Sequence, residues 1–413
     1  MRHSGTACCN VSLNQPAERP GNVRGAVSTL YIDITRLAAR RLERKQPTGV
    51  DRVSQAYIEH YGAQAQALIR HWGRWIAFDP IVSQRLFDAV LGNGTGAERL
   101  IRMSVAAAYP RPARLRRGAI LFNTGHSGLD LPGYAAHVRQ RQLRPVYFLH
   151  DLLPLTHPEF FRDGEADLHR RRLRTMAETG HGLVLNSTST ERDLVEHASA
   201  AKLALPPYVI APLCPARLPT PRDAAPVKGP YFVVLGTIEP RKNHLLLLQI
   251  WRELARRAVQ PMPKLVIVGR RGWECEQVLD LLDRCEGLRD HVVERASCDD
   301  AELATWLHHA RALLFPSFVE GFGLPLVEAL AHGLPVIASD LPIFREVAGD
   351  IPDYVDALDG AGWYQILLGY LQPLDGRRAA QIERLRGFVP STWPDHFEQV
   401  DRLLQHIRPA AAV

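Results

Sequence analysis

Residues 312–339 read ALLFPSFVEGFGLPLVEALAHGLPVIAS and combine two short apolar runs with a glycine-containing loop and a helical segment. The runs ALLFP (312–316) and PVIAS (335–339) have the length and apolar content of buried strands. Between them, LPLVEALAHG (324–333) predicts a helix with Pro325 near its first position. Two apolar strands joined by a helix are typical of a βαβ unit in a parallel sheet that helices cover on both faces.

The same alternation continues on both sides of this unit. It predicts one α/β domain over residues 230–390, with further strands at 231–236, 264–269 and 291–294 and helices at 244–257, 274–286, 299–310, 342–349 and 360–371. Asn243 is the expected N-cap of the first of these helices.

A second α/β domain is predicted over residues 28–214. Its expected strands are 29–35, 66–71, 119–125, 144–150, 182–187 and 207–214, with a glycine turn and helix at 48–61. Six prolines between residues 211 and 230 indicate a linker at 215–229. We expect residues 1–27 to be a disordered tail and residues 391–413 to form a terminal helix that packs back on the first domain. The predicted fold class is therefore α/β, with two doubly wound, Rossmann-like domains facing each other across a cleft.

Length and composition argue against a single-domain protein, a membrane-spanning protein and a secreted protein held by disulfides. The chain has 413 residues, too many for one ordinary core, and its 46% hydrophobic and 23% charged residues are typical of a globular protein. No run of 18 apolar residues predicts a membrane span, and the N-terminus lacks the apolar segment of a secretory signal. Six scattered cysteines indicate a reducing compartment without a disulfide framework, so a cytoplasmic location is expected.

The charge is uneven along the chain. Residues 1–212 hold 28 Lys and Arg against 18 Asp and Glu, whereas the remainder holds 22 against 26. Basic clusters lie at 36–45, 111–118 and 169–174. They are compatible with an ordinary solvated surface or with a surface that meets an anionic membrane or a phosphorylated acceptor. No aromatic side chains are interleaved with them, so nucleic acid is not an expected partner.

Two acids in an otherwise apolar stretch are the strongest functional signal. Glu320 follows a strand in the loop SFVEGFG, and Glu328 lies one turn inside the following helix. The helix N-terminus is an anion site, and Gly321 and Gly323 permit close approach of a ligand to the backbone. Carboxylates beside a phosphate suit the hydroxyl groups of a sugar or a ribose, since a plain buried acid among Leu and Val side chains would be costly.

Basic residues follow two other strands of the same predicted sheet. Arg241 and Lys242, in GTIEPRKN (236–243), precede a helix N-terminus, where the helix dipole disfavours cations. An anion is expected to offset them, and a diphosphate would do so. VGRRGW (268–273) is a weaker, similar signal, with Gly269 and Arg270 at its start. All three loops follow strands of one parallel sheet and are expected to share one edge.

The first domain carries histidines directly after its predicted strands, as the second domain carries charged residues after its own. His126 follows one predicted strand, and His150 and Asp151 follow the next. Together they suit acid–base work or polar recognition, although a single such histidine is often structural. Gly49 lies in the glycine turn of TGVDRV. No spacing predicts a metal site, and no P-loop or GxGxxG loop appears in context.

EGFGLPLVEALAHGLPVIASD (320–340), together with GTIEPRKN and VGRRGW, resembles the retaining GT-B glycosyltransferases of family 4. The resemblance is strong over 229–350, moderate over 119–215 and slight before residue 119. It implies transfer of a hexose from a nucleotide diphosphate sugar without a metal or other cofactor, because cationic side chains neutralise the leaving diphosphate.

The resemblance also implies roles for individual residues. Glu320 would hold the donor sugar hydroxyls and Glu328 the ribose, Arg241 and Lys242 the diphosphate, and His126 and His150 would face the transferred sugar. Other donor contacts would come from Gly236, Gly269, Arg270, Gly321, Phe322, Gly323 and Leu324, and the acceptor side would include Gly49 and Asp151.

VYFLHDLLPLTHPEFF (146–161) and VGRRGW look like members that use GDP-mannose to build bacterial polysaccharides. The implied acceptor is a glycan, lipid-linked and held at the inner membrane surface, where the basic first half would make peripheral contact. The stretch GDIPDYVD (349–356) departs from the pattern, since a small residue usually follows Gly-Asp there.

Three alternatives stay open at this point. In the first, the donor is a UDP- or dTDP-sugar. In the second, the chain is a non-catalytic nucleotide-sugar-binding scaffold of a polysaccharide assembly complex. The third is a phosphorylase or epimerase of the same architecture, although no pyridoxal lysine of a glycogen-type phosphorylase can be placed.

Overall fold

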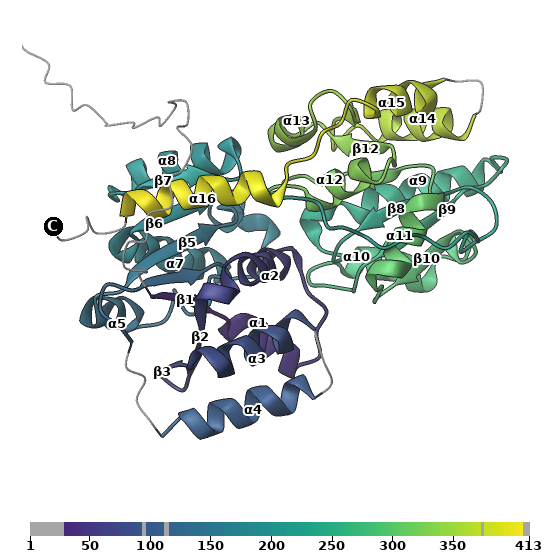
Figure 1. The fold of residues 1–413 in the computed structure, drawn as a ribbon. Coiled ribbons are helices and arrows are strands. Elements are labelled where there is room, and N and C mark those ends of the chain that lie inside the picture. The colour runs from purple at the N-terminus through teal and green to yellow at the C-terminus, as the bar shows by residue number, and fades with distance from the viewer. Residues whose placement is uncertain (1–28, 93–95, 111–114, 373–375, 408–413) are drawn as a thin grey trace, which may run out of the picture.

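The computed structural model describes residues 29–92, 96–110, 115–372 and 376–407. They form two α/β units, each built on its own sheet, that lie side by side in Figure 1. The predicted architecture of two Rossmann-like domains is confirmed. The expected tail at 1–27 and the last six residues lie outside the described parts of the chain.

The first domain contains a seven-stranded sheet in which all neighbouring strands are parallel except one pair. The strand order is β3 (Arg74–Ala77), β2 (Ala65–His71), β1 (Leu30–Asp33), β4 (Ile120–Asn123), β5 (Arg144–Leu149), β6 (Gly182–Leu185) and β7 (Tyr208–Ile210). Its helices are α1 (Thr35–Leu42), α2 (Gly49–Tyr61), α3 (Pro80–Leu91), α4 (Ala97–Ala108), α5 (Tyr134–Arg141), α6 (Leu153–Thr156), α7 (Glu165–Thr179) and α8 (Thr188–Ala200), with 3-10 turns η1 (Gly62–Gln64) and η2 (Pro158–Phe160).

The second domain contains a six-stranded, fully parallel sheet. Its order is β10 (Val292–Arg295), β9 (Lys264–Val268), β8 (Tyr231–Leu235), β11 (Leu313–Phe315), β12 (Val336–Ser339) and β13 (Asp353–Val355). Its helices are α9 (His244–Arg256), α10 (Glu276–Arg284), α11 (Asp300–His309), α12 (Leu324–Ala331), α13 (Pro342–Ala348), α14 (Gly360–Leu371) and α15 (Arg377–Leu385), with 3-10 turns η3 (Pro240–Lys242) and η4 (Glu286–Leu288).

Most predicted elements agree with the structure within a few residues, because the strands are short apolar runs and the helices carry local start signals. Helix α11, for example, begins after Asp299, whose carboxylate accepts from the Glu302 backbone N–H at 2.7 Å in a capping box. Asn243 occupies the N-cap position of α9 but has a left-handed φ of 54°. Its side chain makes no cap and instead donates to the Pro316 and Ala357 carbonyls, so it joins α9 to the strand ends of its own sheet.

The chain passes between the domains twice. Residues 211–230 form no helix or strand, and a second passage lies between α15 and α16 (Trp393–Ile407). In Figure 1, α16 lies across the first domain, far from the helices that precede it. His396 Nδ1 lies 3.0 Å from the Pro212 carbonyl, and the Phe397 ring packs 5.2 Å from that of Tyr57 on α2. These buried contacts attach α16 to the first domain.

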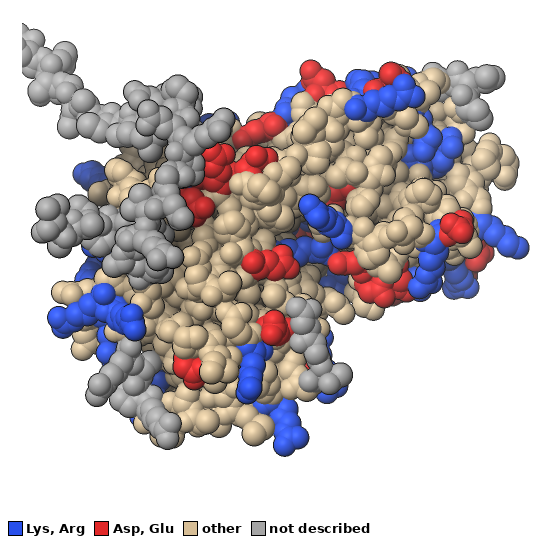
Figure 2. Space-filling model, viewed as in Figure 1, with Lys and Arg blue, Asp and Glu red and all other residues tan. Residues whose placement is uncertain are grey.

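Part of the basic N-terminal sequence has a structural role. Arg36 and Arg40 on α1 both pair with the buried carboxylate of Asp51 on α2, at 2.9 and 2.7 Å. On the face drawn in Figure 2, basic and acidic side chains are interspersed over the first domain. Within the described parts of the chain, no helix is long and apolar enough to cross a membrane.

Candidate active site

The centre of the candidate site is a buried cluster of charges at the edge where the strands of the second sheet end. Glu320 lies in the loop after β11, and both of its carboxylate oxygens have cationic partners. Lys242 Nζ is 2.6 Å from Oε1, and Arg241 Nη1 is 2.8 Å from Oε2. Ser317 also donates its hydroxyl to Glu320 Oε1, at 2.7 Å. The three residues that the sequence marked independently therefore form one hydrogen-bonded unit.

Glu239 is the fourth charge of this cluster, and sequence reasoning missed it. Its carboxylate lies 2.7 Å from Arg241 Nε, and its side chain is only 5% exposed. The cluster thus contains two carboxylates and two cations. The sequence predicts an anionic ligand as the partner of Arg241 and Lys242, whereas in the structure Glu239 and Glu320 of the chain itself pair with them. The only sequence signal for Glu239 was an acid two residues before Arg241 in the same loop.

The pKa values reflect this neutralisation. Burial opposes ionisation of Glu320, but Arg241 and Lys242 outweigh it and lower the pKa of Glu320 to about 2. Burial is also the largest influence on Glu239, whose pKa is raised despite its pairing with Arg241. Lys242 has a lowered pKa because burial disfavours its charge more than Glu320 restores it. Glu239 is therefore the carboxylate of the pair that accepts a proton more readily.

Both glycines in the loop after β11 are required by close contacts. Gly323 precedes α12 with a left-handed φ of 93°, and a Cβ there would lie 2.7 Å from the Phe344 ring. A Cβ on Gly321 would lie 2.8 Å from both Cβ and Oδ2 of Asp151 in the other domain. Phe322 is buried between them. The loop can therefore approach the first domain this closely only because residue 321 lacks a side chain.

The loops GTIEPRKN and VGRRGW lie directly against each other. A Cβ on Gly269 would lie 1.8 Å from the Gly236 carbonyl oxygen, and Ile238 N–H donates to the Arg270 carbonyl at 3.0 Å. Arg270 is exposed, whereas its neighbour Arg271 is held by Asp283 and Glu294 through contacts of 2.6 and 2.9 Å. Arg270 is therefore the arginine of this loop that stays available to a ligand.

Three histidines of the first domain face the same region. His126 and His150, which follow β4 and β5, have ring centroids 5.1 Å apart, and His169 on α7 lies 5.9 Å from His126. Their Nε2 atoms lie 2.7 to 3.0 Å from the carbonyls of Phe148, Thr124 and Asp151. Because a carbonyl oxygen only accepts, each Nε2 carries the proton, and each neutral ring keeps Nδ1 as an acceptor.

Burial keeps these rings neutral. It is the largest cause of the lowered pKa of all three, and it brings the pKa of His150 to about 4. His169 was not singled out from the sequence, since nothing in the helix that carries it marks this side chain. Among the described residues no group of His, Cys, Asp and Glu is arranged to hold a metal ion.

Several contacts join the two domains around the site. A Cβ on Gly49 would lie 3.0 Å from Leu324 Cδ1, which places the start of α2 against the start of α12. Phe160 stacks on Phe318 with a centroid distance of 5.5 Å, and the Arg162 guanidinium lies 4.8 Å from the Trp273 ring centroid. The stretch after β5 therefore packs against loops of the second domain.

Glu328 lies apart from the charge cluster. It is buried on α12 and lines a cavity of about 810 Å³ between the domains, together with Arg52 of α2 and linker residues 213–218. Burial raises its pKa, and Arg52 acts in the opposite direction. The described residues that line this cavity include Leu324 but neither Glu320 nor Arg241, so the two acids of the sequence pattern face different surroundings.

With this geometry established, residues 221–351 match the sequence profile of the family Glycosyl transferases group 1. This segment is a group 1 glycosyltransferase domain. It contains the whole charge cluster, Glu328 and the loops that begin at Gly236 and Gly269.

Curated relatives of the chain include two mannosyltransferases. The chain is 31% identical over 218 residues to the serotype-specific mannosyltransferase WbdA of Escherichia coli, which covers 49% of this chain and 26% of that protein. It is 37% identical over 134 residues to the O-antigen chain mannosyltransferase B of the same species, covering 31% of this chain and 34% of that one. The chain thus spans about a quarter to a third of the length of these relatives.

Solved structures show that the fold extends beyond the group 1 domain. HepE of Anabaena, crystallised with UDP-glucose, superposes with a TM-score of 0.60 at 14% identity, covering 92% of this chain and 98% of that one. The chain has the GT-B fold, in which the group 1 domain is the second of two Rossmann-like domains.

Proposed function

We propose that the protein is a retaining glycosyltransferase that moves a hexose from a nucleotide diphosphate sugar to a hydroxyl of a growing glycan. The observation that carries this proposal is the Glu320, Lys242 and Arg241 cluster at the edge of the group 1 domain, opposite the histidines of the first domain. The mannosyltransferases among its relatives support mannose as the sugar. We propose GDP-mannose as the donor that supplies it.

The proposed chemistry follows from the charges. The bond between the sugar anomeric carbon and the diphosphate oxygen breaks, and its electron pair leaves on the phosphate. Arg241 and Lys242 stabilise that developing charge, which requires Glu320 to exchange them for hydroxyl groups of the donor sugar. The acceptor oxygen bonds to the anomeric carbon on the face that the diphosphate leaves, and the acceptor proton passes to the departing phosphate oxygen.

Other side chains position the substrates in this proposal. Glu328 holds the ribose hydroxyls, and the neutral Nδ1 atoms of His126 and His150 accept from hydroxyls of the transferred sugar. Since two cations already stand where the diphosphate charge develops, we propose that transfer needs no metal and no other cofactor. We also place the reaction in the cytoplasm, on a lipid-linked acceptor held at the inner membrane surface.

A donor panel tests the proposal. The purified protein is incubated with GDP-mannose, UDP-glucose, UDP-galactose, UDP-N-acetylglucosamine and dTDP-rhamnose in the presence of EDTA, and nucleotide release and thermal stabilisation are measured. We expect a response to GDP-mannose alone. A response only to a UDP- or dTDP-sugar would contradict the mannose assignment, and a response that disappears with EDTA would contradict metal independence.

The same panel separates catalysis from mere binding. If GDP-mannose stabilises the protein but releases no nucleotide even with a glycan acceptor extract, the proposed transfer is wrong and a nucleotide-sugar-binding scaffold is the better description. The variant Lys242→Ala is measured beside the wild type. It should abolish nucleotide release while leaving the first domain folded.

A further inference from the structure

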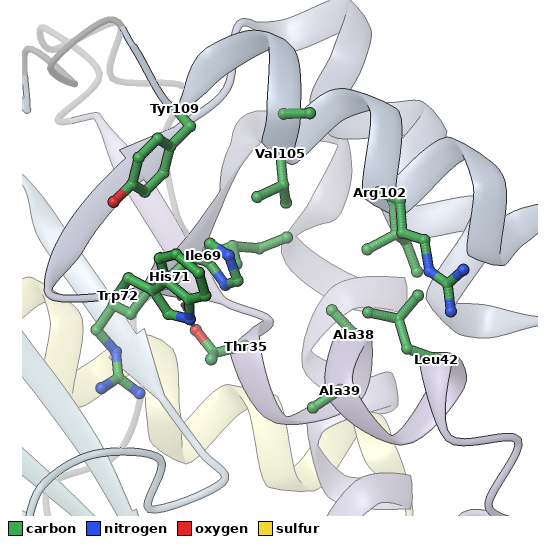
Figure 3. A pocket seen from close by; sticks show the side chains of 13 residues that line it. Thr35, Ala38, Ala39, Leu42, Ile69, His71, Trp72, Arg102, Val105 and Tyr109 are labelled. Atoms are coloured by element: carbon green, nitrogen blue, oxygen red, sulfur yellow. Dashed lines mark hydrogen bonds between the residues drawn. The ribbon is translucent and has the colours of Figure 1, made fainter.

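A second cavity lies in the first domain, away from the charge cluster. It has a volume of about 490 Å³, within the range of roughly 300–1,000 Å³ that is typical of ligand pockets. Figure 3 shows Val105 of α4 and Tyr109, which directly follows α4, on one side and Ala38, Ala39 and Leu42 of α1 on the other. Ile69 and His71 at the end of β2, with Trp72 in the turn after it, close the cavity. We call this space the α1–α4 cavity.

The charges around the α1–α4 cavity have one sign. Its thirteen described lining residues are mainly apolar, and the ionisable ones among them are Arg70, His71, Arg102 and Tyr109, with no carboxylate. Trp72 lies at its mouth with 83% of its surface exposed and with a left-handed φ of 46° in the β2–β3 turn. An apolar space beside cationic groups and an exposed Trp suits an anionic amphiphile.

Arg70 has unused hydrogen-bonding capacity at the edge of this cavity. Its Nε donates to Asp33 Oδ2 at 2.9 Å, and its side chain is only 10% exposed. Its Nη2 is buried and has no hydrogen-bond partner. A buried donor without a partner costs free energy, and a guanidinium with free N–H groups is well suited to a phosphate.

Arg70 also borders a second hollow. This hollow has a volume of about 260 Å³ and shares Thr35, Arg70 and Trp72 with the α1–α4 cavity. Its other side is formed by the loop after β4, including Ser127 and Gly128. Gly128 has a left-handed φ of 67°, and a Cβ there would lie 1.7 Å from Arg70 Nη1, so this loop lies directly against the guanidinium.

These features lie along the edge that carries the histidines. Strands β2, β1, β4 and β5 are neighbours in this order, so Arg70 at the end of β2 is three strand spacings, about 14 Å, from the end of β5. His126 directly precedes Ser127 of the second hollow. A ligand whose anionic group contacts Arg70 would therefore extend toward His126 in one direction and into the apolar cavity in the other.

We propose that the α1–α4 cavity binds the hydrocarbon chain of the acceptor lipid and that Arg70 binds the phosphate group next to that chain. This inference rests on the proposed transfer to a lipid-linked glycan and assigns the part of the chain that selects that lipid. The occupant is an isoprenoid or acyl phosphate, because the lining combines apolar side chains with arginines and lacks a carboxylate among its described residues.

The test measures binding of farnesyl phosphate to the full chain, with farnesol and inorganic phosphate as separate arms, by isothermal titration calorimetry and by Trp fluorescence. Ala106 and Met103 are both exposed residues of α4, but only Ala106 lines the α1–α4 cavity. Ala106→Trp therefore fills the cavity, whereas Met103→Trp adds a Trp to the same helix outside the cavity. Arg70→Lys keeps the ion pair with Asp33 but removes the second donor group.

We expect farnesyl phosphate to bind at least about tenfold more tightly than farnesol or phosphate, and Ala106→Trp and Arg70→Lys each to weaken it by about tenfold or more. Met103→Trp should bind like the wild type. Equal binding of farnesol and farnesyl phosphate would overturn the role of Arg70. Equal effects of the two Trp variants, or binding only to anionic vesicles and not to the soluble probe, would overturn the cavity assignment.

The outcome is separable from that of the donor panel. Thermal stabilisation by GDP is measured in the same variants and depends on the other domain. If farnesyl phosphate binds with the expected variant pattern while no donor responds, the lipid site stands and the proposed transfer fails. If donors respond and farnesyl phosphate does not bind, the transfer stands and this inference fails.

Discussion

At the scale of single residues, Glu320 is the centre of the charge cluster in the second domain. It is the shared anionic partner of Arg241 and Lys242, and all three side chains are largely buried. Breaking a buried ion pair from one side leaves an uncompensated charge, which is more costly than the pair itself was favourable. A diphosphate ligand can only replace Glu320 as the partner of these cations if the carboxylate finds hydroxyl groups instead.

Glu320→Gln should therefore destabilise the free protein by about 3 kcal/mol, since Arg241 and Lys242 lose a buried anion. It should also raise the thermal shift produced by GDP above that of the wild type, because the diphosphate then supplies the missing charge. Both are measured by thermal unfolding with and without GDP. Glu253→Gln is the control, because Glu253 also pairs with two arginines, but on the exposed face of α9. Identical GDP shifts in variant and wild type would contradict this view of the cluster.

Gly321→Ala should reduce kcat/KM by about 100-fold while leaving thermal unfolding nearly unchanged. The added methyl group would overlap Asp151 across the domain interface and hold the domains apart without disturbing the core of either. Steady-state kinetics and unfolding curves check this. Gly287→Ala is the matched control, because a Cβ there meets nothing within 4 Å. An active Gly321→Ala protein would show that the close domain contact is not needed for the reaction.

At the scale of elements, hydrogen bonds between α13 and the start of α8 join the two domains. The Glu346 carboxylate on α13 accepts from the backbone N–H groups of Thr188 and Ser189, at 2.6 and 3.0 Å, and from the Ser189 hydroxyl at 2.9 Å. It thus supplies an anion to the N-terminus of a helix in the other domain, where the dipole favours negative charge.

Glu346→Gln should weaken this interdomain contact by about 1 kcal/mol, a modest value because the contact is exposed and partly screened. The ratio of molecules with the α8–α13 contact broken to molecules with it formed should therefore rise about fivefold. Fluorescence energy transfer between dyes on the two domains measures that ratio without donor. Glu383→Gln is the control, since Glu383 pairs with Arg386 within one domain. An unchanged transfer efficiency in Glu346→Gln would show that other contacts hold the domains together.

At the scale of the whole molecule, buried neutral histidines make stability depend on pH. The pKa of His150 and that of His396 are both lowered by burial from 6.5 to about 4. Between pH 4 and 6.5 the unfolded chain therefore binds protons at these rings that the folded protein does not bind. Stability should be complete above pH 6.5 and should fall as the pH decreases toward 4.

Each such ring should cost about 1.4 kcal/mol of unfolding free energy per pH unit within that window. Urea unfolding at several pH values between 4 and 7 measures the slope. His150→Gln should reduce the slope of unfolding free energy against pH by the contribution of about one proton. The amide can still donate to the Thr124 carbonyl but does not titrate. A variant with the same slope as the wild type would show that His150 does not take up the proton on unfolding.

The sequence by itself determined the alternation of strands and helices along most of the chain and the loops that carry the chemistry. Both follow from local signals: apolar runs define the strands, Pro325 and the Asp299 capping box begin helices, and parallel strands bring their ends to one edge. Glu320, Arg241 and Lys242 were found in this way, each from its place after a strand.

Only the tertiary structure decided which groups meet. Glu320 and Lys242 are 78 residues apart in the chain, and Asp151 approaches Gly321 from the other domain. The separate surroundings of Glu328 and the unpartnered Nη2 of Arg70 have no local sequence signal. The physical reason is that burial and charge pairing depend on residues distant in sequence, whereas helix caps and strand patterns depend on neighbours.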